Sequence, residues 1–447
     1  MADIVSKNGW VDVLPDGWKI VPIKSIFSFK KGLPITKADL VESGIPVISY
    51  GQIHAKSNTG THLSKELLRY IPESIANENP ESRLHENDIV FADTSEDTDG
   101  MGNAVLVDTS DPVYAGYHTV TAVPNNGGNT KYFAYLFLSD CWRLQIRSDA
   151  NGIKVFSITQ SMLRNTQVIV PPVSEQNAIC AYLDSKCADI DSAISEAKAS
   201  IEDYKALKQS IITQAVTQGL NPNAEMKDSG IEWIGEVPSD WKIVPFKRVM
   251  NERNEKNDPI VSEERLSLSI DKGITLYSEK TTNLDRFKDD FTQYKIAHIG
   301  DLVFNSMNMI VGATGVSKYF GCVSPAYYTF YDSTADHITA QYFQYVYTSK
   351  TIRPYLKSLG KGIMSIDRGD DKVNTCRLKI SRDDLRSMAV PCPSIETQRE
   401  IVAYLNEKVV QIDELMADKE TMIADLESYK KSLIYECVTG KREVPNA

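Results

Sequence analysis

The sequence predicts an α/β (α+β) fold, in which two mixed α/β domains are separated by two long helices that pair as an antiparallel coiled coil. Three observations support this prediction: a sequence frame that repeats, two long segments with coiled-coil periodicity, and short strand-like runs between them. The chain has 447 residues, which is enough for several domains of ordinary size. An internal pseudo-twofold repeat is expected.

The repeated frame lies at both ends of each half of the chain. The segment WKIVPIK at 18–24 recurs as WKIVPFK at 241–247, and the pattern of Ile, Tyr-Leu and Ile-Asp at 179–191 recurs at 401–413. The interiors between these matching parts show no such similarity. We therefore expect one frame that holds two different contents, although an old duplication whose halves drifted apart is the simpler alternative. The dissimilar interiors are 25–170 and 248–390.

The second part of the frame is patterned as a coiled-coil helix. In 174–217 and 394–439, apolar residues recur at alternating steps of four and three, and neither segment contains proline or glycine. Gly219 and Gly440 follow as predicted helix stops. The predicted seam, which is also a candidate partner surface, comprises Leu183, Ile190, Ile194, Ile201, Ile211, Leu405, Ile412, Met416, Ile423, Leu426 and Leu433.

A helix with a single apolar stripe needs a partner to cover it. Each helix would be roughly 65 Å long at about 1.5 Å per residue, and antiparallel pairing within the chain is the expected arrangement. Separate helices on two domains, or a coil between two copies of the chain, are the alternatives. Lys208, Lys419 and Lys430 fall in the seam, where they could fix the register, but we expect their ammonium groups to extend into solvent.

The interiors are expected to be mixed α/β, because strand-like runs, amphipathic segments and turn residues alternate along them. The expected strands are 45–49, 88–92, 104–108, 301–304 and 327–331, and the expected helices are 130–147 and 339–358. The expected organisation is an N-terminal domain at 1–173, a central helix at 174–218, a second domain at 219–393 that begins with a linker at 219–240, and a C-terminal helix and tail at 394–447.

Charge and composition restrict the class of protein. The chain is 42% hydrophobic and 24% charged, which excludes a disordered protein. Its net charge is −11, which is unusual for a nucleic-acid-binding protein, but 19–37 contains five lysines and no acid, and 353–386 contains nine basic residues against five acidic ones. No apolar run reaches 18 residues and the N-terminus lacks the layout of a signal peptide, so we expect a cytoplasmic protein.

Motifs of catalysis are absent from the sequence. It contains no phosphate-binding loop, no dinucleotide fingerprint, no amino-methyltransferase tetrapeptide and no G-x-S-x-G or H-E-x-x-H. The loop 93–100 resembles a calcium loop, but counting from Ser95, position twelve is Leu106, where a glutamate belongs. We therefore expect a binding protein with no catalytic residue, no metal ligand and no cofactor.

Several stretches resemble the specificity subunits of Type I restriction-modification systems. The segment 219–247 is similar to that family's junction between the central helix and the second recognition domain. VPPVSEQNAI at 170–179 and VPCPSIETQREI at 390–401 resemble the family's helix entries, although Thr397 is inserted in the second. The interiors resemble two classes of target-recognition domain at 92–105, 116–119, 151–159 and 304–327.

The resemblance implies that two target-recognition domains each read one half of a split, asymmetric site in double-stranded DNA, with the helices holding a fixed gap. It also implies two methyltransferase subunits docked on the helices, and restriction subunits. These partners would carry S-adenosylmethionine, ATP and magnesium, so this chain would perform no catalysis. The system would belong to a bacterium or an archaeon and serve in phage defence.

Base reading needs polar or charged side chains on exposed loops. Asn305 and Asn308 suit contacts to adenine, Arg368 suits guanine, and the lysines suit phosphates. The asparagines, His118 and Glu96 could instead only shape turns, and we expect Trp18 and Trp241 to be core anchors. The candidate DNA-contacting residues are Lys30, Lys31, Ser95, Glu96, His118 and Lys154 in the first domain, and Asn305, Asn308, Arg353, Lys361, Arg368 and Lys372 in the second.

Two other classes of function remain open at this point. One is a coiled-coil scaffold with two ligand-binding heads, which would bind DNA without the steep salt dependence that phosphate contacts produce, or not at all. The other is a nuclease or methyltransferase with an unrecognised site, which would show turnover by itself.

Overall fold

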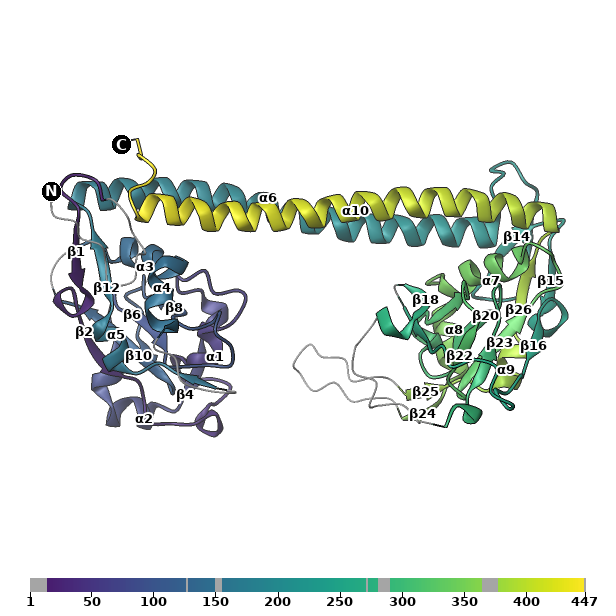
Figure 1. Ribbon diagram of the computed structural model, residues 1–447, viewed down its shortest axis with the longest axis horizontal. Helices are drawn as coiled ribbons and strands as arrows, with labels where there is room; N and C mark the ends of the chain where they lie inside the picture. The colour runs from purple at the N-terminus through teal and green to yellow at the C-terminus, as the bar shows by residue number, and fades with distance from the viewer. Residues whose placement is uncertain are drawn as a thin grey trace. The chain divides into compact units, whose positions relative to one another are not determined.

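A computed structural model describes residues 14–125, 128–148, 155–270, 272–279, 290–363 and 377–445 (Figure 1). The chain forms two compact units: unit 1 contains Met1–Lys198 and Glu420–Ala447, and unit 2 contains Ala199–Lys419. Two long helices, α6 (Val173–Gln218) and α10 (Ile395–Val438), each contribute one portion to either unit. They agree with the two predicted helical segments to within one residue at each end.

Unit 1 is built on a four-stranded antiparallel sheet with the order β2-β10-β6-β8. Alternate residues of β6 point to opposite faces of this sheet. Ile89 and Phe91 pack in the core that contains α3 and α4, whereas Val90 and Ala92 pack in a second core toward the sheet β4-β3-β9-β5. These strands are β2 (Phe27–Lys31), β3 (Ile45–Ile48), β4 (Arg69–Ile71), β5 (Arg83–Leu84), β6 (Ile89–Ala92), β8 (Ala104–Leu106), β9 (Val113–Ala115) and β10 (Thr119–Pro124).

Smaller elements complete unit 1. Two-stranded pairs join β1 to β12 and β7 to β11. The elements are β1 (Lys19–Pro22), β7 (Thr94–Ser95), β11 (Phe156–Ser157), β12 (Gln167–Val170), α1 (Tyr50–Ile53), α2 (Glu73–Glu78), α3 (Thr130–Leu138), α4 (Asp140–Arg147) and α5 (Gln160–Asn165).

Unit 2 contains a four-stranded antiparallel sheet with the matching order β16-β23-β20-β21. Leu302 and Phe304 of β20 pack in the core with α7 and α8, and Val303 packs on the other face. The main elements are β16 (Asn251–Arg253), β20 (Leu302–Asn305), β21 (Thr314–Val316), β23 (Tyr327–Tyr331), α7 (Ile338–Thr348) and α8 (Ile352–Leu359).

The remaining elements of unit 2 form short antiparallel pairs and one helix. They are β13 (Met226–Asp228), β14 (Glu236–Pro238), β15 (Lys242–Pro245), β17 (Leu266–Ser269), β18 (Gly273–Leu276), β19 (Lys295–Ala297), β22 (Gly321–Val323), β24 (Lys361–Ile363), β25 (Arg377–Lys379), α9 (Arg382–Ser387) and β26 (Ala389–Cys392).

The two interiors are more alike than their sequences indicate. Besides the sheet order, they share a turn before the third strand of the sheet, where the backbone N–H of His85 donates to Asp88 at 2.9 Å and that of His298 donates to Asp301 at 2.8 Å. Both aspartates are buried. The expectation of two unrelated contents therefore needs correction, because buried strands tolerate many apolar sequences while the backbone arrangement persists.

Each expected interior helix is in fact two helices. The segment 130–147 divides into α3 and α4 at Ser139, whose hydroxyl donates to the carbonyl of Leu136 at 2.5 Å. The segment 339–358 divides into α7 and α8, with Ser349 directly after α7. Serine side chains compete for backbone hydrogen bonds in this way, which favours helix ends over helix interiors.

Within each unit, the portions of α6 and α10 run antiparallel and meet through apolar side chains. In unit 1, Leu183 and Ile190 share a core with Leu433, and in unit 2 Ile212 shares a core with Leu405. All eleven predicted seam residues are buried or half-buried, the half-buried ones being Ile211, Met416, Ile423 and Leu426.

The sequence led us to expect that the ammonium groups of the seam lysines extend into solvent. Two of these lysines instead form ion pairs with the opposite helix. Lys430 donates to Asp191 at 2.7 Å in unit 1, and Lys208 donates to Asp413 at 2.7 Å in unit 2. Each pair joins one helix to the other, and each lysine side chain is only 25% exposed. These ion pairs favour one register of the two helices; Lys419 is half-buried.

The tryptophans of the repeated frame are core residues. Trp18 is 9% exposed and its Nε1 donates to Glu175 at 2.7 Å, and Trp241 is 2% exposed. The ends of the long helices lie beside them: a Cβ at Gly440 would lie 3.4 Å from the Trp18 ring, and one at Gly219 would lie 3.2 Å from the Trp241 ring. Both glycines have a positive φ, 73° and 75°, which a helix stop of this kind requires.

Candidate nucleic-acid interface

In unit 1, three strand ends meet at one edge of the main sheet. Strands β2 and β6 both run antiparallel to β10, so β2 and β6 end at this edge and β10 begins there. The register places Val120 opposite Lys31 and Thr119 opposite Ala92. Lys31, His118 and the loop after β6 therefore lie along the same edge, which we call the unit 1 edge.

His118 is held in place at this edge while its side chain stays 58% exposed. Its Nδ1 lies 3.1 Å from Asp93 Oδ1, and the ring of Tyr50 lies 5.4 Å from the imidazole in an edge-to-face arrangement. Its backbone φ of 53° is uncommon for a residue other than glycine. A strained and exposed polar residue of this kind is typical of a functional surface.

The loop between β6 and β8 extends from the unit 1 edge, and it contains the short strand β7, which pairs with β11. Ser95 is buried, and its hydroxyl donates to the carbonyl of Asp97 at 2.7 Å. Ser95 therefore shapes the turn and is not accessible to DNA, which corrects the prediction that it contacts bases. Glu96 and Asp97 are exposed, and the Asp97 carboxylate accepts from the N–H of Gly100 at 2.6 Å.

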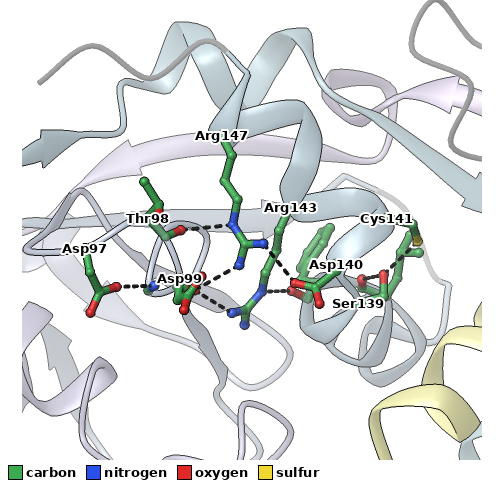
Figure 2. A network of polar contacts seen from close by, with 11 residues as sticks. Asp97, Thr98, Asp99, Ser139, Asp140, Cys141, Arg143 and Arg147 are labelled. Carbon is green, nitrogen blue, oxygen red and sulfur yellow. Dashed lines mark hydrogen bonds and ion pairs between the residues drawn. The ribbon is translucent and has the colours of Figure 1, made fainter. Parts of the chain in front are cut away.

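Two arginines of α4 point toward this loop and support it, as Figure 2 shows. Arg147 donates to the carbonyls of Thr98 at 2.9 Å and Asp99 at 3.1 Å, and to the carboxylate of Asp140 at 3.0 Å. Arg143 donates to the carbonyls of Phe137 at 2.8 Å and Asp99 at 3.4 Å. Burial and the neighbouring Arg147 lower the pKa of Arg143 to about 10, so it stays charged at neutral pH.

The sequence reasoning missed both arginines. They belong to the segment expected to be one amphipathic helix. A charged residue in such a helix is normally assigned to the face that is exposed to solvent. The signal that could have found them is their spacing of four residues, which puts both guanidinium groups on one side of a helix.

In unit 2, the matching edge is formed by the end of β20, the start of β23 and the end of β16. Asn305 lies at the end of β20 opposite Tyr327, and its Oδ1 accepts from the N–H of Met307 at 3.1 Å. Asn308 follows in the same loop, and both asparagines are half-buried. The Asn305 side chain therefore shapes the turn through its oxygen, while its amide N–H groups remain as possible donors.

Arg353 and Lys361 lie on elements that follow this sheet. Arg353, on α8, approaches Gly312 in the loop after β20, since its Nη2 would lie 3.3 Å from a Cβ at that glycine. Among the described residues, no acceptor is found for its buried Nε, and burial lowers the pKa of its guanidinium. Lys361 begins β24 and is exposed.

Lys30 lies one residue further from the unit 1 edge than Lys31, and both are exposed. Burial raises the pKa of Asp88, and the N–H of His85 together with the charges of His85 and Lys30 oppose that shift. Lys154, Arg368 and Lys372 lie outside the residues that the structure describes.

The long helices carry exposed apolar side chains away from their shared seam. In unit 2 these are Leu207, Val410 and Leu415, and in unit 1 they are Val173, Met422 and Tyr429, each between 39% and 54% exposed.

Within the described ranges, no helix combines the length and apolar character that crossing a membrane would require. In the same part of the chain, no group of three or more His, Cys, Asp or Glu side chains is placed to hold a metal ion.

Several known proteins are similar to this chain. Residues 15–202 match the family described as "Type I restriction modification DNA specificity domain". The putative type I restriction enzyme MjaX specificity subunit of Methanocaldococcus jannaschii is 21% identical over 98% of this chain and 96% of its own length. The type I restriction enzyme EcoKI specificity subunit of Escherichia coli K12 is 20% identical over 96% of this chain and 90% of its own length.

Solved structures support the fold. A chain from work on complex assembly and conformational transition of the type I R-M system has a TM-score of 0.65 and 16% identity, and it covers 96% of this chain and 100% of its own. The HsdS subunit of Thermoanaerobacter tengcongensis has a TM-score of 0.50 and 17% identity, with 96% and 98% covered. The solved structures share the fold of this chain, and the chain resembles Type I restriction-modification specificity subunits over nearly its whole length.

Proposed function

We propose that this chain supplies DNA sequence specificity to a Type I restriction-modification complex, with each recognition domain reading one half of a bipartite, asymmetric site. The observation that supports this most is the matching sheet edge of the two units. The scaffold is the same, but unit 1 presents His118, Lys31 and Glu96 there, whereas unit 2 presents Asn305 and Asn308. One scaffold with different side chains suits two different half-sites.

The chemistry of these side chains suggests how they act. Lys30, Lys31 and Lys361 would bind phosphates, which position the protein without reading sequence. The exposed Glu96 carboxylate repels phosphates, and at a base edge it would accept from an amino group such as that of cytosine. Asn308 would pair with adenine, and Arg353 offers donors to guanine or to a phosphate.

Three further candidates come from the sequence alone. Lys154, Arg368 and Lys372 remain proposed DNA contacts on that basis, within a recognition domain at 1–173 and a second one at 219–393 that includes the linker at 219–240.

The helices at 174–218 and 394–447 would set the gap between the half-sites and dock two methyltransferase subunits. Two features of the helices support this role. The ion pairs Lys430–Asp191 and Lys208–Asp413 favour a single register, and the exposed apolar residues, such as Leu415 and Tyr429, offer a surface for helices of a partner. Restriction subunits would join the complex, and the partners would carry S-adenosylmethionine, ATP and magnesium in the cytoplasm of a bacterium or archaeon. This chain itself would bind the DNA and position the partner subunits on it.

The test is a methylome. The chain is co-expressed with the methyltransferase subunit encoded beside it, and modified adenines are mapped by long-read sequencing. A single split motif with a constant gap is the expected result. A soluble complex that leaves the host DNA unmodified, and whose DNA binding has no salt dependence, would contradict the proposal and favour a scaffold.

A further inference from the structure

We propose that Arg143 and Arg147 are positioning residues for the first half-site, which hold the loop of residues 96–99 (the acidic loop) in the shape that presents Glu96 to DNA. This inference rests on the proposed function. Neither arginine is placed to read a base itself, because their N–H groups are directed at backbone carbonyls of the loop and of α3 (Figure 2).

The start of the loop is held by β7, which pairs with β11, and by His54. Ser95 and Asp97 close its first turn, as described above, and His54 Nε2 lies 2.7 Å from the carbonyl of Thr94 at the loop's start. Around Thr98 and Asp99, the N–H of Met101 donates to the Thr98 carbonyl at 3.3 Å, and the remaining support comes from the arginines of α4. A guanidinium is suited to this role, because its rigid fork can bind two acceptors at once.

The platform beneath the arginines is rigid. Trp142, between them in the sequence, is fully buried, and it packs against Phe137 and Phe91 of the main core with ring centroids 4.3 and 5.7 Å apart. Below the same loop, a Cβ at Gly102 would lie 3.2 Å from the Trp142 ring and 3.4 Å from Arg143 Cγ. The loop therefore lies directly on α4, and the position of α4 is fixed by the core.

Charge also matters for this arrangement. The acidic loop would approach DNA with exposed carboxylates, which the phosphates repel. Two guanidinium groups directly beneath the loop offset this repulsion, and one of them, Arg147, is partly neutralised by Asp140. Burial, and after it the like charge of Arg147, lower the pKa of Arg143, so placing two guanidinium groups side by side is unfavourable in itself.

Unit 2 provides a comparison within the same chain. Its helix α8 follows α7 as α4 follows α3, and α8 places Arg353 beside the loop after β20. No hydrogen bond from Arg353 to that loop is found among the described residues. The support by arginine is therefore a feature of the first recognition domain, and its loss should affect only the first half-site.

The test uses the full chain in complex with its methyltransferase subunits, after the target has been determined. Arg147→Lys and Arg147→Gln are measured first, since the Arg147 side chain is 19% exposed and lies at the end of α4. Arg143→Lys is the second variant. The measurement is the ratio of affinities for matched and mismatched DNA, taken separately for each half-site, together with the salt dependence of non-specific binding.

The expected result is that the ratio for the first half-site falls at least tenfold in Arg147→Gln and Arg147→Lys, since lysine retains the charge but not the fork. The ratio for the second half-site and the salt slope stay unchanged. Arg69→Lys is the matched control, because Arg69 also donates to two backbone carbonyls of unit 1, Glu66 at 3.2 Å and Leu68 at 2.8 Å. It should lower the melting temperature without altering either ratio.

Two outcomes would overturn the inference. If the ratios stay unchanged while only the melting temperature falls, the arginines are structural. If non-specific affinity falls and the salt slope decreases by about one, Arg147 contacts a phosphate. Failure of the proposed function is distinguishable from both, because the wild-type complex would then show no split motif at all.

Discussion

Replacing Arg253 by methionine tests how unit 2 neutralises a buried carboxylate in its main sheet. The Asp301 side chain is 2% exposed, and Arg253 donates to both of its oxygens, from Nε at 2.7 Å and from Nη2 at 3.2 Å. The Arg253 guanidinium also lies 4.7 Å from the centre of the Tyr331 ring. Methionine fills a similar volume but supplies no donor, so Asp301 would keep the N–H of His298 and lose its ion pair.

The expected magnitude follows from this burial. Removing one partner of a buried ion pair typically costs about 3–5 kcal/mol, because the remaining charge is left uncompensated. We expect the free energy of unfolding of unit 2 to fall by about that amount. The assay is urea denaturation of the full chain, followed by hydrogen exchange so that the loss can be assigned to one unit.

Lys30→Met is the matched control. Lys30 lies opposite Thr121, as Arg253 lies opposite Thr329, and each occupies the same strand position in its sheet. Lys30 is exposed, so its replacement should change stability by less than about 0.5 kcal/mol. Equal and small losses in both variants, or a loss in Arg253→Met spread over both units, would refute the reasoning.

Three more predictions concern the cores, the helices and pH. Leu183→Ala should lower the free energy of unfolding by about 2–5 kcal/mol in denaturant titration, because Leu183 is fully buried in the core that joins α6 to α10. Inserting four residues after Ala197 should turn the following part of α6 by about 40° and shift it by about 6 Å. The methylome should then show an altered gap between the half-sites or no modification. An unchanged gap with full activity would contradict the proposal that the helices set the gap. Asp88→Asn should raise the melting temperature at pH 7 but not at pH 3. Burial raises the pKa of Asp88 in the folded state, so the ionisation of Asp88 opposes folding as the pH rises through that pKa. An equal gain in melting temperature at both pH values would refute this.

Long-range periodic features could be predicted from the sequence. The heptad pattern located α6 and α10 closely, because a 4-3 repeat without proline or glycine has few other stable conformations. It did not reveal that Lys208 and Lys430 pair with aspartates of the opposite helix, since the sequence does not state which residues the packing brings together.

The interiors were harder to predict because their architecture depends on sheet pairing between distant segments. The strand around Phe91 and the strand around Phe304 could be identified, but their equivalence could not, because few side chains are shared. Ser95 illustrates the limit for sites: a polar residue in a loop resembles a DNA contact until the structure shows its hydroxyl turned to Asp97. Arg147 shows the converse, since its role depends on a loop 48 residues away.

The most direct test of the account compares the methylomes of two single variants, His118→Ala in unit 1 and Asn308→Ala in unit 2, each co-expressed with the methyltransferase subunit. The account predicts that each variant relaxes one half of the split motif and leaves the other half and the gap unchanged, and that the two variants relax different halves. Relaxation of the same half by both variants, or of both halves by either one, would contradict the claim that each domain reads its own half-site.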